Sequence, residues 1–126
     1  MVNKAKEPSE EILKWLKQAR RDLKTAKNNL KNKDYYASAF FSQQAVEKGL
    51  KALYIKRFKK LWRIHDLVEL AKKVNAEAEI IEACIRINPA YTGTRYPDVF
   101  ESYNEQNSGE IFKLAKKVLK WIEEQC

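Results

Sequence analysis

A heptad-like seam of apolar residues near the start of the chain does most to limit what it can fold into. Apolar residues recur there at alternating steps of four and three: Ile12, Leu16, Ala19, Leu23, Ala26 and Leu30. This period places them on one face of a helix about three heptads long. Ser9 is a suitable N-cap for that helix, and Glu10 and Glu11 suit its first turn. Residues 1–8 are polar, and we expect them to form a frayed start.

A second helix is predicted from about Tyr35 to Arg57, after a short break in which Asp34 can act as the cap. One arc of this helix is apolar or small, which suits the centre of a bundle: Ser38, Phe41, Ser42, Ala45, Val46, Gly49, Ala52 and Leu53. The opposite arc is polar and contains Gln44, Glu47, Lys48 and Lys51. This polar arc is either an ordinary solvent-exposed (wet) surface or a stripe of residues that binds a ligand. Phe40 and Ile55 lie within it, which indicates that it is partly covered.

The rest of the chain contains three further helical patterns. Phe58 to Ile64 is a basic and aromatic connection, followed by a short helix around residues 67–74 that Asn75 ends. A fourth helix covers about residues 76–88 and stops before Pro89. Residues 90–107 form the only long irregular segment, and loops of this length are usually functional or disordered. Ser108 is the expected cap of the last helix, which ends near residue 123.

These patterns predict an all-α fold. The expected architecture is a mostly up-and-down bundle of three long and two shorter helices, with a long loop before the last one. Only three Gly and three Pro occur in 126 residues, which favours long regular elements. The length predicts a single domain spanning residues 1–126.

The net charge of +8 is unevenly distributed. Residues 1–63 contain 17 Lys or Arg and 6 Asp or Glu, whereas residues 64–126 contain 8 and 11. A basic half and a mildly acidic half suit polyanion binding, head-to-tail association or an acidic protein partner. The alternative, which has equal weight, is that the lysines only keep the protein soluble. The charged fraction of 33% is typical of proteins from hot environments.

The composition excludes several classes of protein. No signal peptide or membrane-spanning run is evident, so we expect a cytoplasmic protein with no membrane contact. Cys84 and Cys126 do not form a disulfide framework or a metal site, and Cys84 has the surroundings of a small core residue. His65 is the only histidine. We therefore expect neither a metal nor a cofactor, and no phosphate-binding glycine loop occurs.

Two residues could carry chemistry on their own. His65 stands before Asp66 at a predicted helix start, where a capping or packing role competes with a catalytic one. Arg95 lies in the long irregular segment, where it could grip a phosphate or anchor the loop by stacking on Tyr91 or Tyr96.

Three stretches together resemble HEPN domains (higher eukaryotes and prokaryotes nucleotide-binding). Residues 39–53, AFFSQQAVEKGLKAL, are similar to the central helix of that family, residues 65–70, HDLVEL, to its next short helix, and residues 91–98, YTGTRYPD, to its late segment. The resemblance implies a helical bundle, frequent homodimers and partnership with a minimal nucleotidyltransferase, in some pairs as toxin and antitoxin. Carried over residue by residue, it implies that the ligand-binding residues are Gln44, Glu47, Lys48, Lys51, His65, Tyr91, Arg95, Tyr96 and Asp98.

The chain departs from the ribonuclease members of that family. Those members carry an Arg with a His a few residues later, whereas no His follows Arg95. We therefore expect a non-enzymatic module that binds a nucleotide or an RNA phosphate and has no catalytic residue. One alternative is a ribonuclease with a composite Arg95 and His65 site. The other is a homodimeric interaction module without a ligand, with Phe40, Tyr54 and Trp62 at the dimer face.

Overall fold

A computed structural model describes residues 9–126, and the expected frayed start at residues 1–8 lies outside the described residues. The described part contains no strand, and its three long helices are α1 (Glu10–Lys31), α2 (Tyr35–Phe58) and α6 (Glu105–Gln125). Two shorter helices are α3 (Leu67–Lys73) and α4 (Ala78–Ile87). The predicted all-α class and the five helices are thus confirmed. The segment expected to be irregular also contains α5 (Ala90–Gly93) and a 3-10 turn, η2 (Phe100–Ser102).

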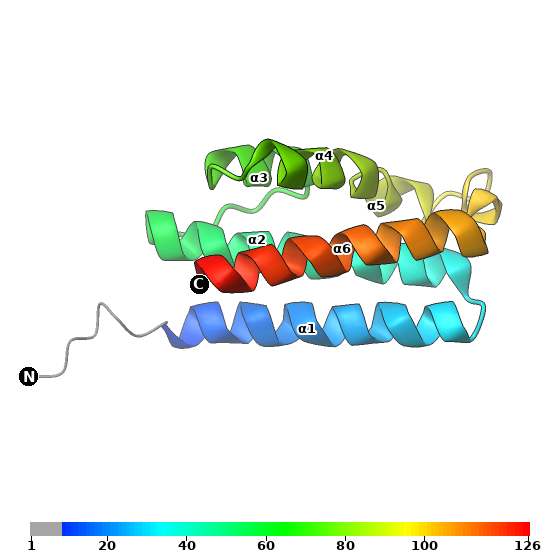
Figure 1. Cartoon of the computed structure of the whole chain (residues 1–126), viewed down its shortest axis with the longest axis horizontal. Helices are drawn as coiled ribbons and strands as arrows, with labels where there is room; N and C mark the ends of the chain where they lie inside the picture. Colours follow the sequence, from blue (N-terminus) through cyan, green and yellow to red (C-terminus); the bar gives the residue numbers. More distant parts are fainter. Residues whose placement is uncertain (1–8) are drawn as a thin grey trace, which may run out of the picture.

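The helices form a bundle with α2 in the middle. In Figure 1 the long helices lie side by side, and α3, α4 and α5 cover the side of α2 and α6 that is remote from α1. The side chain of Ser38 ties α2 to α1, because its Oγ donates to the Ala26 carbonyl at 2.8 Å. At Gly49 a Cβ would lie 3.0 Å from a methyl group of Leu119 and of Ile122, so the absence of a side chain lets α6 approach closely.

The structure shows which residues cap the three long helices, and these can be compared with the predicted N-caps. Ser9 caps α1 as expected, because its hydroxyl accepts from the Ile12 amide at 3.2 Å. Asp34 is the N-cap of α2, but its side chain makes no capping hydrogen bond. The prediction that Ser108 caps the last helix is wrong. Asn104 caps α6 in a reciprocal pair with Asn107, whereas Ser108 is fully buried and donates to the Tyr35 carbonyl at 2.9 Å.

The core also explains the environment of Cys84. Its side chain is fully buried, as the sequence predicts, and this burial raises the pKa of the thiol to about 12. None of the helices within residues 9–126 combines the length and apolar character that crossing a bilayer requires.

Candidate functional site

The polar arc of α2 is covered along part of its length. Glu47 is 4% exposed and Lys51 is 6% exposed. Lys51 Nζ lies 2.9 Å from Glu47 Oε2 and 5.8 Å from the ring centroid of Trp15 on α1. The wet-surface alternative is therefore wrong for these two residues, which form a buried ion pair. Buried charges of this kind need complete hydrogen bonding to be tolerated.

The Glu47 carboxylate has that hydrogen bonding. Gln43 Nε2 donates to its Oε1 at 3.0 Å, and its Oε2 lies 3.0 Å from His65 Nδ1 as well as next to Lys51. Because an ionised carboxylate only accepts hydrogen bonds, Nδ1 carries the proton in this contact. Nε2 is then the nitrogen that is open to other partners, on a side chain that is 54% exposed. Glu47 thus fixes the orientation of a half-open imidazole.

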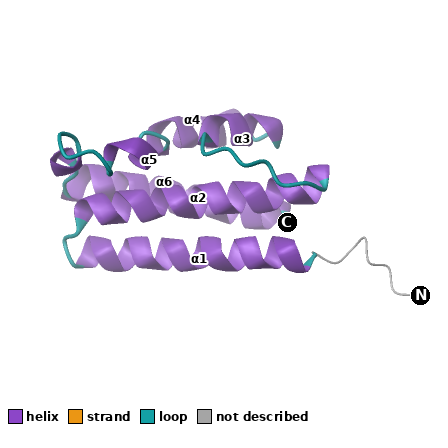
Figure 2. Cartoon of the chain, turned by 180° about the vertical axis from the view of Figure 1, so that it is seen from behind, coloured by secondary structure: helices purple, strands orange, loops and turns teal. Residues whose placement is uncertain are grey.

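Two neighbouring elements hold His65 in this place. The connection after α2 runs back along α2 before α3 begins (Figure 2). Asp66, the N-cap of α3, accepts hydrogen bonds from the amides of Val68 and Glu69. Its Oδ1 also accepts from Asn88 Nδ2 at 3.1 Å, and Asn88 Oδ1 accepts from the Leu67 amide at 2.9 Å. The start of α3 is therefore fastened to the end of α4.

This fastening brings α5 beside His65. The ring of Tyr91 in α5 stacks on the His65 ring, with centroids 4.5 Å apart and planes 16° apart. Arg95 follows α5, and its Cζ lies 4.1 Å from the centroid of the Tyr91 ring. Thr94 steadies the intervening turn, because its buried hydroxyl donates to the Ala90 carbonyl at 2.7 Å. We call His65, Tyr91 and Arg95 the Tyr91 cluster.

The remaining predicted residues lie elsewhere. Lys48 Nζ is 2.6 Å from Asp22 Oδ2 on α1, and Gln44 donates to the Gln43 side chain at 2.7 Å. Tyr96 is 57% exposed and Asp98 is exposed; within the described residues, no side-chain hydrogen bond or ion pair joins either residue to the cluster. The structure therefore brings together Glu47, Lys51 and the Tyr91 cluster, and it leaves Gln44, Lys48, Tyr96 and Asp98 outside this group.

Sequence reasoning missed some of the supporting residues. Gln43 could have been found, because it lies one helical turn before Glu47 and can hydrogen-bond to it. Asn88 carried no comparable signal, since its partners on α3 lie more than 20 residues away. Trp15 carried no signal either, because it lies on α1 and meets Lys51 of α2 only in the folded chain.

The aromatic residues considered for a dimer face are largely used within the chain. Tyr54 is 7% exposed, and its ring centroid lies 4.5 Å from that of Phe58 and 5.4 Å from that of Trp62. The Phe40 ring packs edge-to-face on Phe41. Tyr54 is therefore not available to a partner, and this part of the dimer prediction is wrong.

The arrangement suits anion binding and proton transfer. Arg95 is exposed, and stacking on Tyr91 restricts its guanidinium, which offers a fork of donors for a phosphate. His65 offers a second donor or a general base close by. Within residues 9–126 no group of three or more His, Cys, Asp and Glu is placed to hold a metal ion.

Comparison with known proteins agrees with this architecture. The HEPN domain model matches residues 12–125. The crystal structure of TT1696 from Thermus thermophilus is 30% identical with a TM-score of 0.87, covering 94% of this chain and 100% of that one. ST0689, described as an archaeal HEPN homologue, is 29% identical with a TM-score of 0.79, covering 93% and 98%. An HEPN domain protein from Thermotoga maritima, 20% identical with a TM-score of 0.72, covers 88% and 95% and shares the fold. None of the curated proteins matches. The chain belongs to the HEPN domain family.

Proposed function

We propose that the chain binds a nucleotide or an RNA phosphate at the Tyr91 cluster and acts with a minimal nucleotidyltransferase in a toxin–antitoxin-like pair. In this role it is a cytoplasmic homodimer. The observation that carries the binding site is the packing of the exposed Arg95 guanidinium on the Tyr91 ring, next to the imidazole that Glu47 orients.

The physical argument rests on preorganisation. A free arginine side chain loses rotamer entropy when it binds an anion, whereas a stacked guanidinium has already lost part of it. Arg95 Cζ and the His65 ring centroid lie 4.1 Å and 4.5 Å from the Tyr91 ring centroid, and therefore at most 8.6 Å from each other. One nucleotide is long enough to contact both side chains.

Titration calorimetry with ATP and with a short single-stranded RNA tests this site. We expect Arg95→Ala to weaken binding about 10- to 150-fold, as for the loss of a hydrogen bond to a charged group. Arg86→Ala is the matched control, because Arg86 is an exposed arginine whose partners are Glu82 and Glu110. Unchanged affinity in Arg95→Ala, or equal losses in both variants, would exclude the Tyr91 cluster as the site.

A second candidate function is metal-independent cleavage of RNA by His65 and Arg95. The contact between Glu47 and His65 favours it, because a carboxylate that orients an imidazole is a recurring device of acid–base catalysis. Arg95 would then stabilise the charge that develops on the phosphate.

Incubation of labelled RNA with the protein in the presence of a chelator decides between the two functions. Cleavage that disappears in His65→Ala while the variant still binds the RNA, even if more weakly, would support the ribonuclease. If the wild-type protein binds the RNA but leaves it intact, the result supports a function in binding alone. Co-purification with a minimal nucleotidyltransferase encoded nearby tests the partnership separately.

A further inference from the structure

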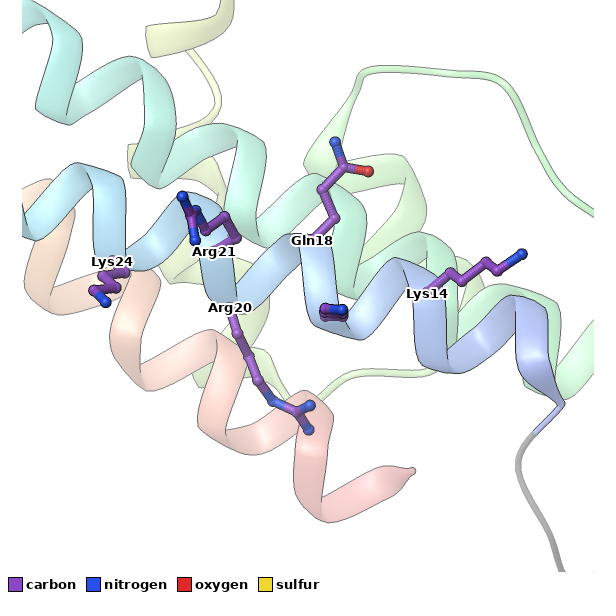
Figure 3. Close-up of a pocket in the computed structure, with 6 residues that line it drawn as sticks. Lys14, Gln18, Arg20, Arg21 and Lys24 are labelled. Atoms are coloured by element: carbon purple, nitrogen blue, oxygen red, sulfur yellow. The ribbon is translucent and has the colours of Figure 1, made fainter.

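The outer side of α1 carries an unusual excess of positive charge. Between Ile12 and Lys33 the sequence has eight basic residues and a single acidic one, Asp22. Asp22 is 7% exposed and is paired with Lys48 of α2, so it does not offset the charge outside. The exposed basic residues of α1 form what we call the α1 basic face: Lys14, Lys17, Arg20, Arg21, Lys24, Lys27 and Lys31. Figure 3 labels Lys14, Arg20, Arg21 and Lys24 along α1.

Most charges of this face are uncompensated. Lys14 pairs with Glu10, and Arg20 reaches across to Glu123 on α6. Within residues 9–126 the other five have no ion-pair partner: Lys17, Arg21, Lys24, Lys27 and Lys31. Most neighbours along the helix are separated by three or four residues, and like charges at that spacing destabilise a helix by a few tenths of a kcal/mol per pair.

The outer surface of α4 and α6 shows how a purely solubilising surface can be built. There Arg86 pairs with both Glu82 and Glu110, and Lys117 pairs with Glu79. Mixed charges of this kind keep a protein soluble without mutual repulsion. The α1 basic face lacks such acidic partners, and its concentration of positive charge favours a negatively charged ligand.

The shape of this surface extends the charge onto α6. A shallow depression of about 500 Å³ lies among side chains of α1, and a second one of about 420 Å³ lies between α1 and α6. Arg20 and Lys24 line both, so the two depressions lie next to each other. Lys116 of α6 adds a further cation at the second depression, whereas the acidic residue there, Glu123, is bound by Arg20. The basic surface therefore continues across the groove between the two helices.

The spacing of the cations suits a linear polyanion. At a rise of 1.5 Å per residue, most successive cations stand about 4.5–6 Å apart along the axis, and the face from Lys14 to Lys31 is about 26 Å long. None of its members is aromatic, and the one aromatic residue that lines the two depressions, Phe112 of α6, is half-buried. The face therefore offers no row of rings on which successive unpaired bases could stack. A row of cations without stacking groups matches the backbone of a duplex better than a single strand.

We propose that the α1 basic face, together with Lys116, binds the sugar–phosphate backbone of double-stranded nucleic acid without regard to sequence. This surface is separate from the Tyr91 cluster, because α1 and the elements α3 to α5 lie on opposite sides of α2 in both Figure 1 and Figure 2. Duplex binding at α1 therefore does not depend on nucleotide binding at the cluster.

Fluorescence anisotropy with a labelled RNA duplex of about two helical turns tests this surface. With about five phosphate contacts, the logarithm of the association constant should fall by about 4.5 for each tenfold rise in salt. The triple variant Lys17→Gln, Arg21→Gln and Lys24→Gln should reduce that slope by about 2.7 and weaken binding by about tenfold or more. A second duplex of unrelated sequence should bind equally well.

The matched control removes the same charge from elsewhere on the surface. The triple variant Lys60→Gln, Lys72→Gln and Lys73→Gln alters three exposed lysines outside α1 and should keep the wild-type slope. Equal losses in both triple variants would mean that only net charge matters, and no duplex binding at low salt would overturn the assignment outright. An acidic helical peptide that displaces the duplex more effectively than unlabelled duplex would instead identify a protein-docking surface. Arg95→Ala should change duplex affinity far less than the triple variant of α1 does, which separates this test from that of the Tyr91 cluster.

Discussion

The Tyr91 cluster and the α1 basic face both expose cations, but they hold them in different ways. The cluster is assembled from separate segments of the chain and is backed by the buried Glu47 carboxylate. The α1 basic face comes mainly from one helix, and five of its seven side chains have no ion-pair partner within residues 9–126. The first surface is defined by geometry and the second by charge density. Substitutions that shift the side chains should weaken binding at the Tyr91 cluster, whereas added salt should weaken binding at the α1 basic face.

The largest expected effect comes from removing the carboxylate behind the cluster. Glu47→Ala leaves Lys51 buried without a partner and frees His65, so we expect a loss of about 3–5 kcal/mol in the free energy of unfolding. Urea denaturation measures this loss. The exposed Glu82→Ala serves as the control and should leave stability almost unchanged. A loss in Glu47→Ala no larger than in Glu82→Ala would contradict a buried, fully bonded carboxylate.

A smaller effect is expected at the cap that fastens α3 to α4. Asp66→Ala removes two hydrogen bonds to the α3 amides and one to Asn88, at a cost of about 0.5–2 kcal/mol. Because His65 is adjacent, ATP binding should also weaken, while duplex binding at α1 should not. The cap of α2 provides a matched control, since the Asp34 side chain makes no capping hydrogen bond. Comparable losses in Asp34→Ala and Asp66→Ala would disprove the positioning role of Asp66.

The smallest effect concerns the ion pair that joins α1 to α6. Arg20 and Glu123 are partly exposed, with side chains 54% and 37% accessible, so a double-mutant cycle should give about 0.2–1 kcal/mol at low salt. Glu123→Ala removes the acidic residue from the basic groove, and duplex affinity should therefore rise a few-fold while ATP affinity stays constant. A fall in duplex affinity would show that the groove does not contact the duplex.

The sequence could predict the fold because each long helix has a local signature. The seam from Ile12 to Leu30 depends only on spacing, so α1 was expected at the right place, and α6 was expected to start a few residues later than it does. The start of α6 was predicted wrongly because Ser108 was chosen as the N-cap, whereas Asn104 is the N-cap and forms a reciprocal pair with Asn107. Local signals of this kind identify helices well and their first residues less well.

The site was less accessible to sequence reasoning because its members meet only through the fold. Glu47 and Arg95 could be singled out, but nothing local shows that a buried carboxylate reaches His65 or that Tyr91 stacks there. The burial of Lys51 depends on Trp15, which lies on another helix. The excess of basic residues between Ile12 and Lys33 can be read from the sequence. The pairing of Asp22 with Lys48 and of Glu123 with Arg20 becomes visible only once α2 and α6 lie beside α1.

The connection between α2 and α3 has a further consequence for how the length of this chain can vary. Surface connections commonly tolerate insertions and deletions, because lengthening a loop costs little free energy. This connection is fixed at both ends, by the close of α2 at Lys59 and by the cap at Asp66, and it delivers His65 onto Glu47 just before that cap. One residue more or fewer would shift the imidazole from its carboxylate. We expect relatives that keep this pairing to keep the length of this connection.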